Sequence, residues 1–389
     1  MNQIPHTTGK KVLFITTKNT DYIRNRQEIR LLSQDAASLD VIGSTAGNYA
    51  GRLFHVYRKL LTTDFSQYDT IFIGFAPQLV LPLFYKKIKS SLQFAHSSKS
   101  LLRNKYTRSN NQSHADSRQQ PTHDSKVIVI DFFISLFDTF CNDRKVFKPT
   151  GPIGRFLHHL DQKTLALADE IICDTACHKE YFHSEFSADK NHLHALYLNA
   201  DTDIYHPMKV TKPFELTNRF VVLYFGSILP LQGVDTVLHA YDRLKNDSRL
   251  MLIFIGPLKK NSLLPKGDNI KYYKWLSQAQ LAKCIAMADL CLAGHFHPTI
   301  EKAKRTIPGK AFIYQAMGKP MILGDTPANH ELFDENNPQV YFTKLGDAGA
   351  LAELILNIAS PLPAHHSLRQ MQEIDAPDKS MPAHKAHPF

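Results

Sequence analysis

Four cations lie within nine residues in the second half of the chain. They are Lys302, Lys304, Arg305 and Lys310, and they precede and begin a segment with helical spacing. Pro308 suits the first turn of that helix, because its missing N–H costs nothing there. The free N–H groups and the dipole at a helix N-terminus attract anions. These residue types and their spacing predict a diphosphate site, with a solvated basic loop as the alternative.

Two glycine-containing strand ends could bring the main chain close to the same ligand. The first is YFGSILPLQG, in which Gly226 and Gly233 lie between a strand and a helix. The second is FIGP, which ends at Pro257. A glycine lets a ligand approach the backbone closely. Each pattern is weak by itself, because strand–glycine–helix turns occur in every α/β protein.

Acidic candidates lie in the first half of the chain. Asp131 ends an apolar run, where a charge is costly without a partner. It could contact an acceptor hydroxyl or a donor sugar, or it could cap a turn or a helix. Asp138 and Asp143 are second choices, because such residues are usually surface pairs. Asp174 and Thr175 follow another strand end and could equally cap a helix.

Short apolar runs that alternate with helical patterns must position these residues. In the first half they include KVLFITT (11–17), TIFIGF (70–75) and VIVIDFF (127–133). Runs that are apolar on both faces and separated by helices are typical of a parallel sheet covered on both sides. The pattern restarts at FVVLYFGS (220–227), after a join at 201–213 that is rich in turn residues.

We therefore predict an α/β protein of two doubly wound domains that face each other across a cleft. The N-terminal domain spans 1–205 and the C-terminal domain spans 206–360. In open parallel sheets, ligands bind beyond the carboxyl ends of the strands. Two further segments do not fit a packed core: a basic segment, 86–126, predicted to be a disordered insert, and a tail, 361–389, rich in His and Pro.

The motifs of the second half occur in the order that they have in glycosyltransferase family 4, and that half resembles the family's donor-binding domain. The family has the GT-B fold of two facing Rossmann-like domains. LNADTDIYHP (198–207) resembles its linker between the domains. VIVIDFFISLFDT (127–139) and CDTACHKEYF (173–182) resemble a bacterial branch that assembles surface polysaccharides. The motifs of the second half are the glycine pair Gly226 and Gly233, FIGP, ADLCLA (288–293), IPGK (307–310) and AMGKPMI (316–322).

The resemblance implies a retaining, metal-independent transfer of a hexose from a nucleotide-diphosphate sugar. The acceptor would be a carbohydrate or a lipid-linked molecule, in cell-surface polysaccharide or glycolipid synthesis. Fixed cations would stabilise the leaving diphosphate, because negative charge develops on it. The implied catalytic residues are Asp131, Lys302, Arg305 and Lys310. The implied donor-binding residues are Gly226, Ser227, Gln232 and Gly233 at the phosphates, Gly256 and Pro257 near the base, and Lys304, Asp325, Thr326 and Glu331.

The sequence departs from the family at several binding positions. Many members carry two acidic residues eight positions apart, of which the second binds the ribose; here they correspond to Arg305 and Ile313. The usual Arg and Lys of the first phosphate loop correspond to Ser227 and Gln232. Ribose recognition is therefore unassigned, and the phosphate-binding charge is relocated to 302–310. Two alternatives stay open: a non-catalytic scaffold protein of a polysaccharide assembly complex, and another nucleotide-sugar enzyme such as an epimerase.

We expect no cofactor and no metal. DTD (201–203) has the Asp-x-Asp pattern that binds a divalent metal in glycosyltransferases of the other main fold, but it lies in the linker. The histidines lack the spacing of a closed zinc site. The five cysteines lack CxxC spacing, which favours a reduced, cytoplasmic compartment. The N-terminus is not predicted to be a signal peptide, since its apolar run is only about six residues long.

The net charge of +10 has two local sources. Nine Lys and Arg against two Asp in 86–126, and four cations against Glu301 in 301–310, account for all of it. The basic segment lacks the interleaved aromatic residues of a nucleic-acid stacking surface, so we predict no nucleic-acid partner. An anionic membrane surface is a further candidate partner, with peripheral binding on the inner face. RLFHVYRKLL (52–61) could lie on lipid as a basic amphipathic helix, or pack its apolar stripe on a sheet.

Overall fold

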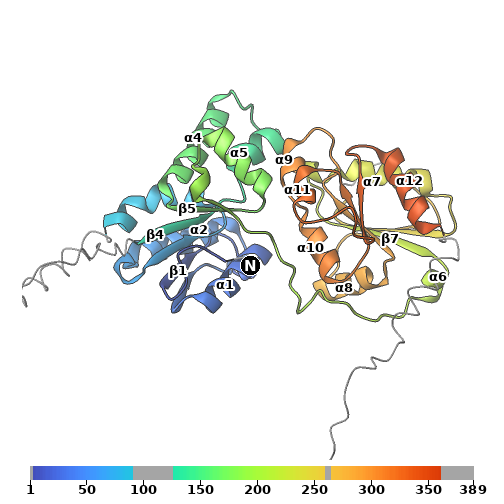
Figure 1. Ribbon diagram of the computed structural model, residues 1–389, viewed down its shortest axis with the longest axis horizontal. Coiled ribbons are helices and arrows are strands. Elements are labelled where there is room, and N and C mark those ends of the chain that lie inside the picture. The colour runs from blue at the N-terminus through green and yellow to red at the C-terminus, as the bar shows by residue number, and fades with distance from the viewer. Residues whose placement is uncertain (1–2, 91–125, 259–263, 361–389) are drawn as a thin grey trace, which may run out of the picture.

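The computed structural model describes residues 3–90, 126–258 and 264–360. Two parallel sheets of six strands form two domains (Figure 1), in the orders β2-β1-β3-β4-β5-β6 and β12-β11-β10-β7-β8-β9. The first comprises β1 (Lys11–Ile15), β2 (Ser38–Ile42), β3 (Thr70–Ile73), β4 (Val127–Asp131), β5 (Glu170–Cys173) and β6 (Leu193–Ala195). The second comprises β7 (Phe220–Phe225), β8 (Leu250–Ile255), β9 (Ile270–Tyr273), β10 (Leu290–Gly294), β11 (Met321–Gly324) and β12 (Val340–Thr343).

Helices cover both faces of each sheet. The N-terminal domain has α1 (Ile23–Asp35), α2 (Tyr49–Thr62), a helix over residues 81–90, a π-helical turn η3 (Asp138–Asp143), α4 (Pro152–Leu167) and α5 (Ala176–Phe186). The C-terminal domain has α6 (Phe214–Thr217), α7 (Val234–Leu244), α8 (Gln278–Met287), α9 (Glu301–Arg305), α10 (Gly309–Ala316), α11 (Pro327–His330) and α12 (Ala348–Ala359). The predicted fold, two facing doubly wound domains, is confirmed.

The burial of the strands explains why the apolar runs predicted them. All residues of β3, β5, β8 and β10 are buried, so both faces of these strands lie against apolar side chains. Separate apolar clusters form on the two sides of each sheet. Continuous Val, Ile, Leu and Phe runs are what a sheet buried on both faces requires.

The basic segment 86–126 is described only at its ends. Residues 86–90 continue the helix over 81–90, in which Ile88 is fully buried. Residues 91–125 and the tail 361–389 lie outside the described residues. In the part of the chain that is described, no helix has the length and apolarity needed to cross a bilayer.

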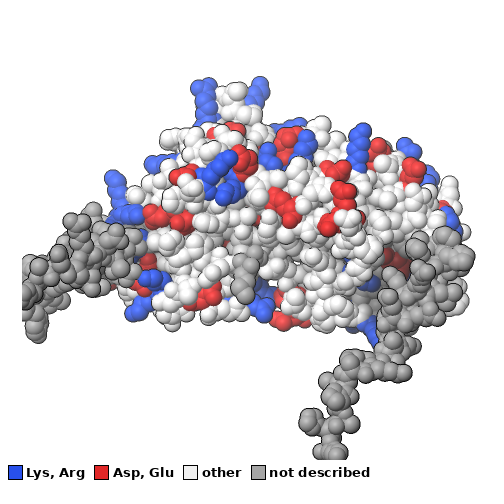
Figure 2. Space-filling model, viewed as in Figure 1, with Lys and Arg blue, Asp and Glu red and all other residues white. Residues whose placement is uncertain are grey.

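The two domains meet along a small set of elements. Helices α9 and α11 of the C-terminal domain lie against η3 and α5 of the N-terminal domain (Figure 1). On the face drawn in Figure 2, acidic and basic side chains are interspersed over both domains. Neither positive nor negative charge therefore predominates on that face of the molecule.

Candidate functional site

A cleft of about 1260 Å³ lies between the domains. One wall is α1 with the loop before it, and the linker around Asp201 contributes to the lining. The other wall is formed by strand ends and helices of the C-terminal domain, including Gly226, Ser227, Ile255 and Ile313. The cleft therefore lies where two facing parallel sheets are expected to bind a ligand.

Lys310 lies directly behind the cleft wall, in the first turn of α10. Its side chain is buried, its ammonium donates to Gln232 Oε1, and it lies 4.4 Å from the centre of the Tyr224 ring. No carboxylate among the described residues pairs with it. Burial lowers the pKa of Lys310 to about 7. A buried cation without a counter-charge is costly, and an anionic ligand at this point would stabilise it.

Glycines open the space around this ammonium. A Cβ on Gly226 would lie 3.2 Å from Lys310 Nζ, and a Cβ on Gly294 would lie 2.8 Å from it. Gly233 has a φ of +61°, and a Cβ there would lie 2.5 Å from the main chain of Phe296. Gly256 packs equally closely against Gly226. Predicted donor-binding residues Gly226, Gln232 and Gly233 therefore converge with Lys310, and exposed Ser227 lies beside them in the cleft.

The prediction that all four cations surround one helix N-terminus is wrong. The segment forms two helices, because Thr306 to Pro308 interrupt it, and only Lys310 belongs to α10. Lys302 and Arg305 share one face of α9, as residues three apart do on a helix. Lys304 points elsewhere and pairs with Glu301 at 2.7 Å on the surface.

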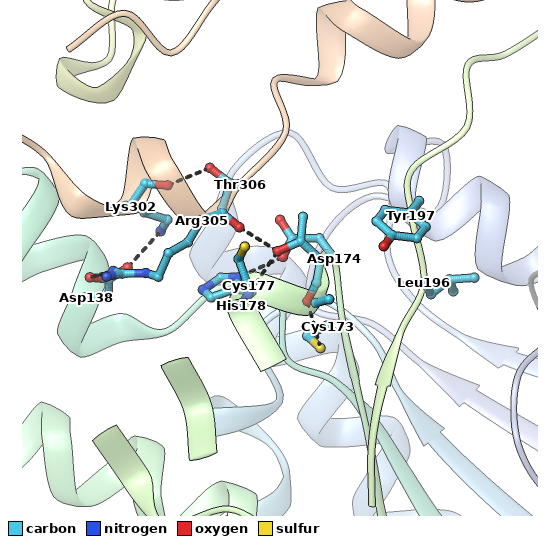
Figure 3. A network of polar contacts seen from close by, with 12 residues as sticks. Asp138, Cys173, Asp174, Cys177, His178, Leu196, Tyr197, Lys302, Arg305 and Thr306 are labelled. Carbon is cyan, nitrogen blue, oxygen red and sulfur yellow. Dashed lines mark hydrogen bonds and ion pairs between the residues drawn. The ribbon is translucent and has the colours of Figure 1, made fainter. Parts of the chain in front are cut away.

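Lys302 and Arg305 contact the N-terminal domain (Figure 3). Arg305 Nη2 donates to Asp138 Oδ1 at 2.9 Å, and Lys302 Nζ donates to Thr139 Oγ1 at 2.9 Å. The guanidinium lies 3.8 Å from the centre of the Tyr181 ring. Asp138 is fully buried, so these cations balance its charge across the domain interface.

Glu331, predicted to contact the donor, also joins the domains. Its carboxylate accepts from the backbone N–H groups of Ala176 and Cys177, each at 2.7 Å, and from Tyr197 Oη at 2.8 Å. It therefore caps the N-terminus of α5, a helix of the other domain. Burial, with Glu331 alongside, raises the pKa of the Cys177 thiol to about 12.

The two other predicted residues of this loop have local partners. Thr326 caps α11 by accepting from Asn329 N, and Asp325 pairs with His330 at 2.8 Å on the surface. Pro257 is exposed after β8, next to buried Gly256. Four of the predicted donor-binding residues therefore do not line the cleft: Gly256, Pro257, Asp325 and Thr326.

We expect Glu331→Gln to lower the thermal unfolding midpoint by about 5 °C, because charged capping bonds contribute about 2 kcal/mol. Glu353→Gln, at an exposed position of α12, is the matched control and should leave the midpoint unchanged. Calorimetry of the two variants measures the difference. Equal midpoints would show that Glu331 contributes nothing to the interface.

Asp131 forms a buried ion pair instead of lining the cleft. Its two oxygens accept from Arg24 Nε at 2.9 Å and Nη2 at 3.1 Å. Glu28 lies 3.2 Å from the same guanidinium, and burial together with Asp131 raises the pKa of Glu28 well above its usual range. Asp131 therefore does not cap a helix or turn here; its oxygens are held by Arg24. The charged pair was missed, although Arg24, Glu28 and Leu32 follow the spacing of a buried helix face.

Of the remaining acidic candidates in this domain, Asp143 is buried at the end of η3 and Asp174 has a partner. Asp174 Oδ1 lies 2.6 Å from Nδ1 of buried His178. Although burial would raise the pKa of Asp174, the neighbouring His178 gives a net lowering. Thr175 caps α5 by accepting from His178 N at 2.9 Å, as one of the two interpretations of this strand end predicted.

Several residues that line the cleft were not predicted from the sequence, because isolated aromatic and basic residues on a helix or after a strand indicate no particular ligand. Trp275 follows β9, is 74% exposed and lines the cleft, and Tyr22, Arg26 and Arg30 line it from the N-terminal domain. Arg26 pairs with Asp201 of the DTD motif at 2.6 Å. Among the described residues, no group of three or more His, Cys, Asp or Glu is placed to hold a metal ion.

Comparisons with known proteins agree with this geometry. Residues 219–360 match the family model of Glycosyl transferases group 1. No curated protein matches the chain. Anabaena Alr3699/HepE in complex with UDP shares 14% identity at a TM-score of 0.54, over 89% of each chain. Sucrose-phosphate synthase from Thermosynechococcus elongatus shares 12% identity at a TM-score of 0.55, over 90% of this chain and 89% of that one.

The fold and the site define a GT-B protein with two Rossmann-like domains. The family match adds that residues 219–360, in its C-terminal domain, carry the sequence pattern of the group 1 glycosyl transferases.

Proposed function

We propose that the protein is a retaining hexosyltransferase of family 4 that uses a nucleoside-diphosphate sugar. Its acceptor is a carbohydrate or lipid-linked molecule of surface polysaccharide or glycolipid synthesis, and the reaction needs no metal. The observation that carries the proposal is the buried ammonium of Lys310, which pairs with no carboxylate of residues 3–90, 126–258 or 264–360 and lies behind glycine at the cleft wall. Structures of Alr3699/HepE with UDP and with UDP-glucose support a donor of this class.

Lys310 would stabilise the diphosphate as the sugar leaves. Negative charge develops on the leaving phosphate when the glycosidic bond breaks, and a fixed cation in a water-poor site stabilises that charge strongly. Gln232 holds the ammonium in place, and Gly226 lets the phosphate approach it. In this proposal no Asp or Glu acts as the general base or general acid of the transfer. The departing phosphate would take the proton of the acceptor hydroxyl.

The nucleoside would occupy the cleft beside the same glycine. Ile255 and Ile313 give that wall an apolar character, and Trp275 offers a flat aromatic surface at its edge. Ile313 cannot accept a hydrogen bond from a ribose, so the ribose would bind through other polar groups of the cleft. The replacement of the family's acidic residue by Ile313 also favours the scaffold alternative, in which nucleotide binding has been lost.

A thermal-shift screen against nucleoside diphosphates and nucleotide sugars tests the proposal, because a ligand that binds the folded state raises the midpoint. UDP or GDP should raise it in the wild type and leave Lys310→Ala unshifted. No shift with any nucleotide at millimolar concentration would favour the non-catalytic scaffold. Product analysis separates transfer, which releases a nucleoside diphosphate, from epimerisation, which does not.

A further inference from the structure

Two neighbouring helices of the N-terminal domain leave large apolar side chains in solvent. Phe54 and Leu61 on α2 are 71% and 67% exposed, and Leu83 on the helix over 81–90 is 66% exposed. The packing stripe of α2 consists of other residues, including Val56 and Leu60, which are fully buried. The amphipathic segment therefore packs on the sheet and still presents two apolar residues outward.

The exposed residues of α2 lie on the side that faces the second helix. Tyr57 Oη donates to Leu79 O at 2.6 Å, and the rings of Tyr57 and Phe84 are 5.6 Å apart. Phe54 and Leu61 lie one turn before and one turn after Tyr57, so they share its side of α2.

Leu83 lies on the matching side of the second helix. Lys87, one turn beyond it, reaches back to Leu60 O at 2.8 Å. Leu83 therefore faces the same groove between the helices as Phe54 and Leu61 do. The three side chains form one apolar seam at the solvent edge of the helix pair.

Cations flank this seam, and the two helices that form it contribute no acid. Neither α2 nor the segment 81–90 contains Asp or Glu. Arg58 lies within one turn of both Phe54 and Leu61, Lys86 lies one turn from Leu83, and exposed Lys59 follows Arg58 on α2. Within the described part of the chain, the side chains of Arg58, Lys59 and Lys86 have no ion-pair or hydrogen-bond partner. The helix over 81–90 lies at the end of the N-terminal domain remote from the C-terminal domain (Figure 1).

We propose that this basic seam, defined as Phe54, Leu61 and Leu83 with Arg58, Lys59 and Lys86, binds the surface of an anionic lipid bilayer. The apolar side chains enter the boundary between headgroups and acyl chains, and the cations contact the anionic headgroups. The positive charge that the two helices contribute favours lipid over a protein partner, because an anionic bilayer matches it without specific geometry. The proposal is independent of the transfer reaction, since α2 and the segment 81–90 do not line the cleft.

Sedimentation of the full-length protein with vesicles tests it. The wild type should bind phosphatidylcholine vesicles that contain phosphatidylglycerol and should not bind phosphatidylcholine alone. Arg58→Gln/Lys59→Gln/Lys86→Gln should lower binding about a hundredfold, because each cation near an anionic surface contributes roughly fivefold. Phe54→Ser/Leu61→Ser/Leu83→Ser should lower binding by at least about tenfold, because charge without apolar insertion anchors weakly.

Matched controls come from the C-terminal domain. Lys209→Gln/Lys266→Gln/Lys283→Gln removes the same charge from exposed sites, and Phe214→Ser removes an exposed aromatic ring. Both should bind vesicles like the wild type. All variants should keep the wild-type unfolding midpoint, because the replaced side chains are exposed.

Three outcomes would overturn the proposal: no binding to anionic vesicles, equal binding to neutral ones, or binding that neither seam variant reduces. A dimer in sedimentation equilibrium that the apolar variant dissociates would assign the seam to a second copy of the chain instead. Nucleotide thermal shifts, measured without vesicles, report separately on the proposed transfer.

Discussion

Lys310→Met is expected to abolish nucleoside-diphosphate affinity and at the same time to stabilise the ligand-free protein. The affinity should fall at least about a hundredfold, because a charged hydrogen bond in a buried site is lost. The stability should rise by about 2 to 4 kcal/mol near pH 7, because methionine fills the site without burying a charge. Calorimetry of ligand binding and of thermal unfolding measures both effects.

The pH dependence of these effects has a definite sign. Burial lowers the pKa of Lys310 from 10.5 to about 7. Between these two values the unfolded chain holds a proton that the folded protein lacks, so wild-type stability rises with pH from about 7 to 10.5. Below pH 7 both states are protonated, and the destabilisation is constant. Lys310→Met should remove this slope.

Diphosphate binding should depend on pH in the opposite direction. A bound anion favours the ammonium form and raises the pKa of Lys310, so binding takes up a proton above pH 7. The affinity should then fall by up to about tenfold for each pH unit. The exposed control Lys283→Met should retain both pH profiles. A nucleotide affinity that is unchanged in Lys310→Met would remove Lys310 from the donor site.

Asp138→Asn is expected to open the two domains relative to each other. Arg305 and Lys302 would lose the carboxylate that balances them, and removal of one partner from a buried ion pair costs about 3 to 5 kcal/mol. Both cations lie near the surface of the interface, so domain separation would let water replace Asp138. Small-angle scattering should show a larger radius of gyration for the variant.

A double-mutant cycle isolates this contact. Arg305→Gln should destabilise more than Asp138→Asn, because Asp138 is fully buried and would retain an unpaired charge. The double variant should be less destabilised than the sum of the singles. Additive effects, with no change in scattering, would show that the ion pair does not hold the domains closed. Arg305→Gln should also reduce nucleotide affinity less than Lys310→Met does.

The sequence was most informative where one residue's environment depends on its near neighbours. Apolar runs such as VIVIDFF predicted the buried strands correctly, because burial on both faces leaves a continuous pattern. Pro308 predicted a helix start beside a cation, and α10 begins there with Lys310 in its first turn. These features are local in the chain, so spacing reveals them.

The domain interface could not be predicted in the same way. Asp138 and Arg305 are 167 positions apart, and Glu331 and Ala176 are 155 apart. Nothing in the composition of either segment identifies its partner, because a charged residue near a helix end is compatible with many contacts. The pairing of Asp131 with Arg24 could not be predicted from the sequence either, since only the packing of α1 on the sheet brings Arg24 to Asp131.

The position of Glu331 at the start of α5 gives the molecule a built-in reporter of motion. The amide protons of Ala176 and Cys177 are held by a carboxylate of the opposite domain, so they are released whenever the domains part. Their rate of exchange with deuterated solvent therefore measures how often the cleft opens. A donor that closes the cleft should slow the exchange of these two amides, even though it touches neither of them.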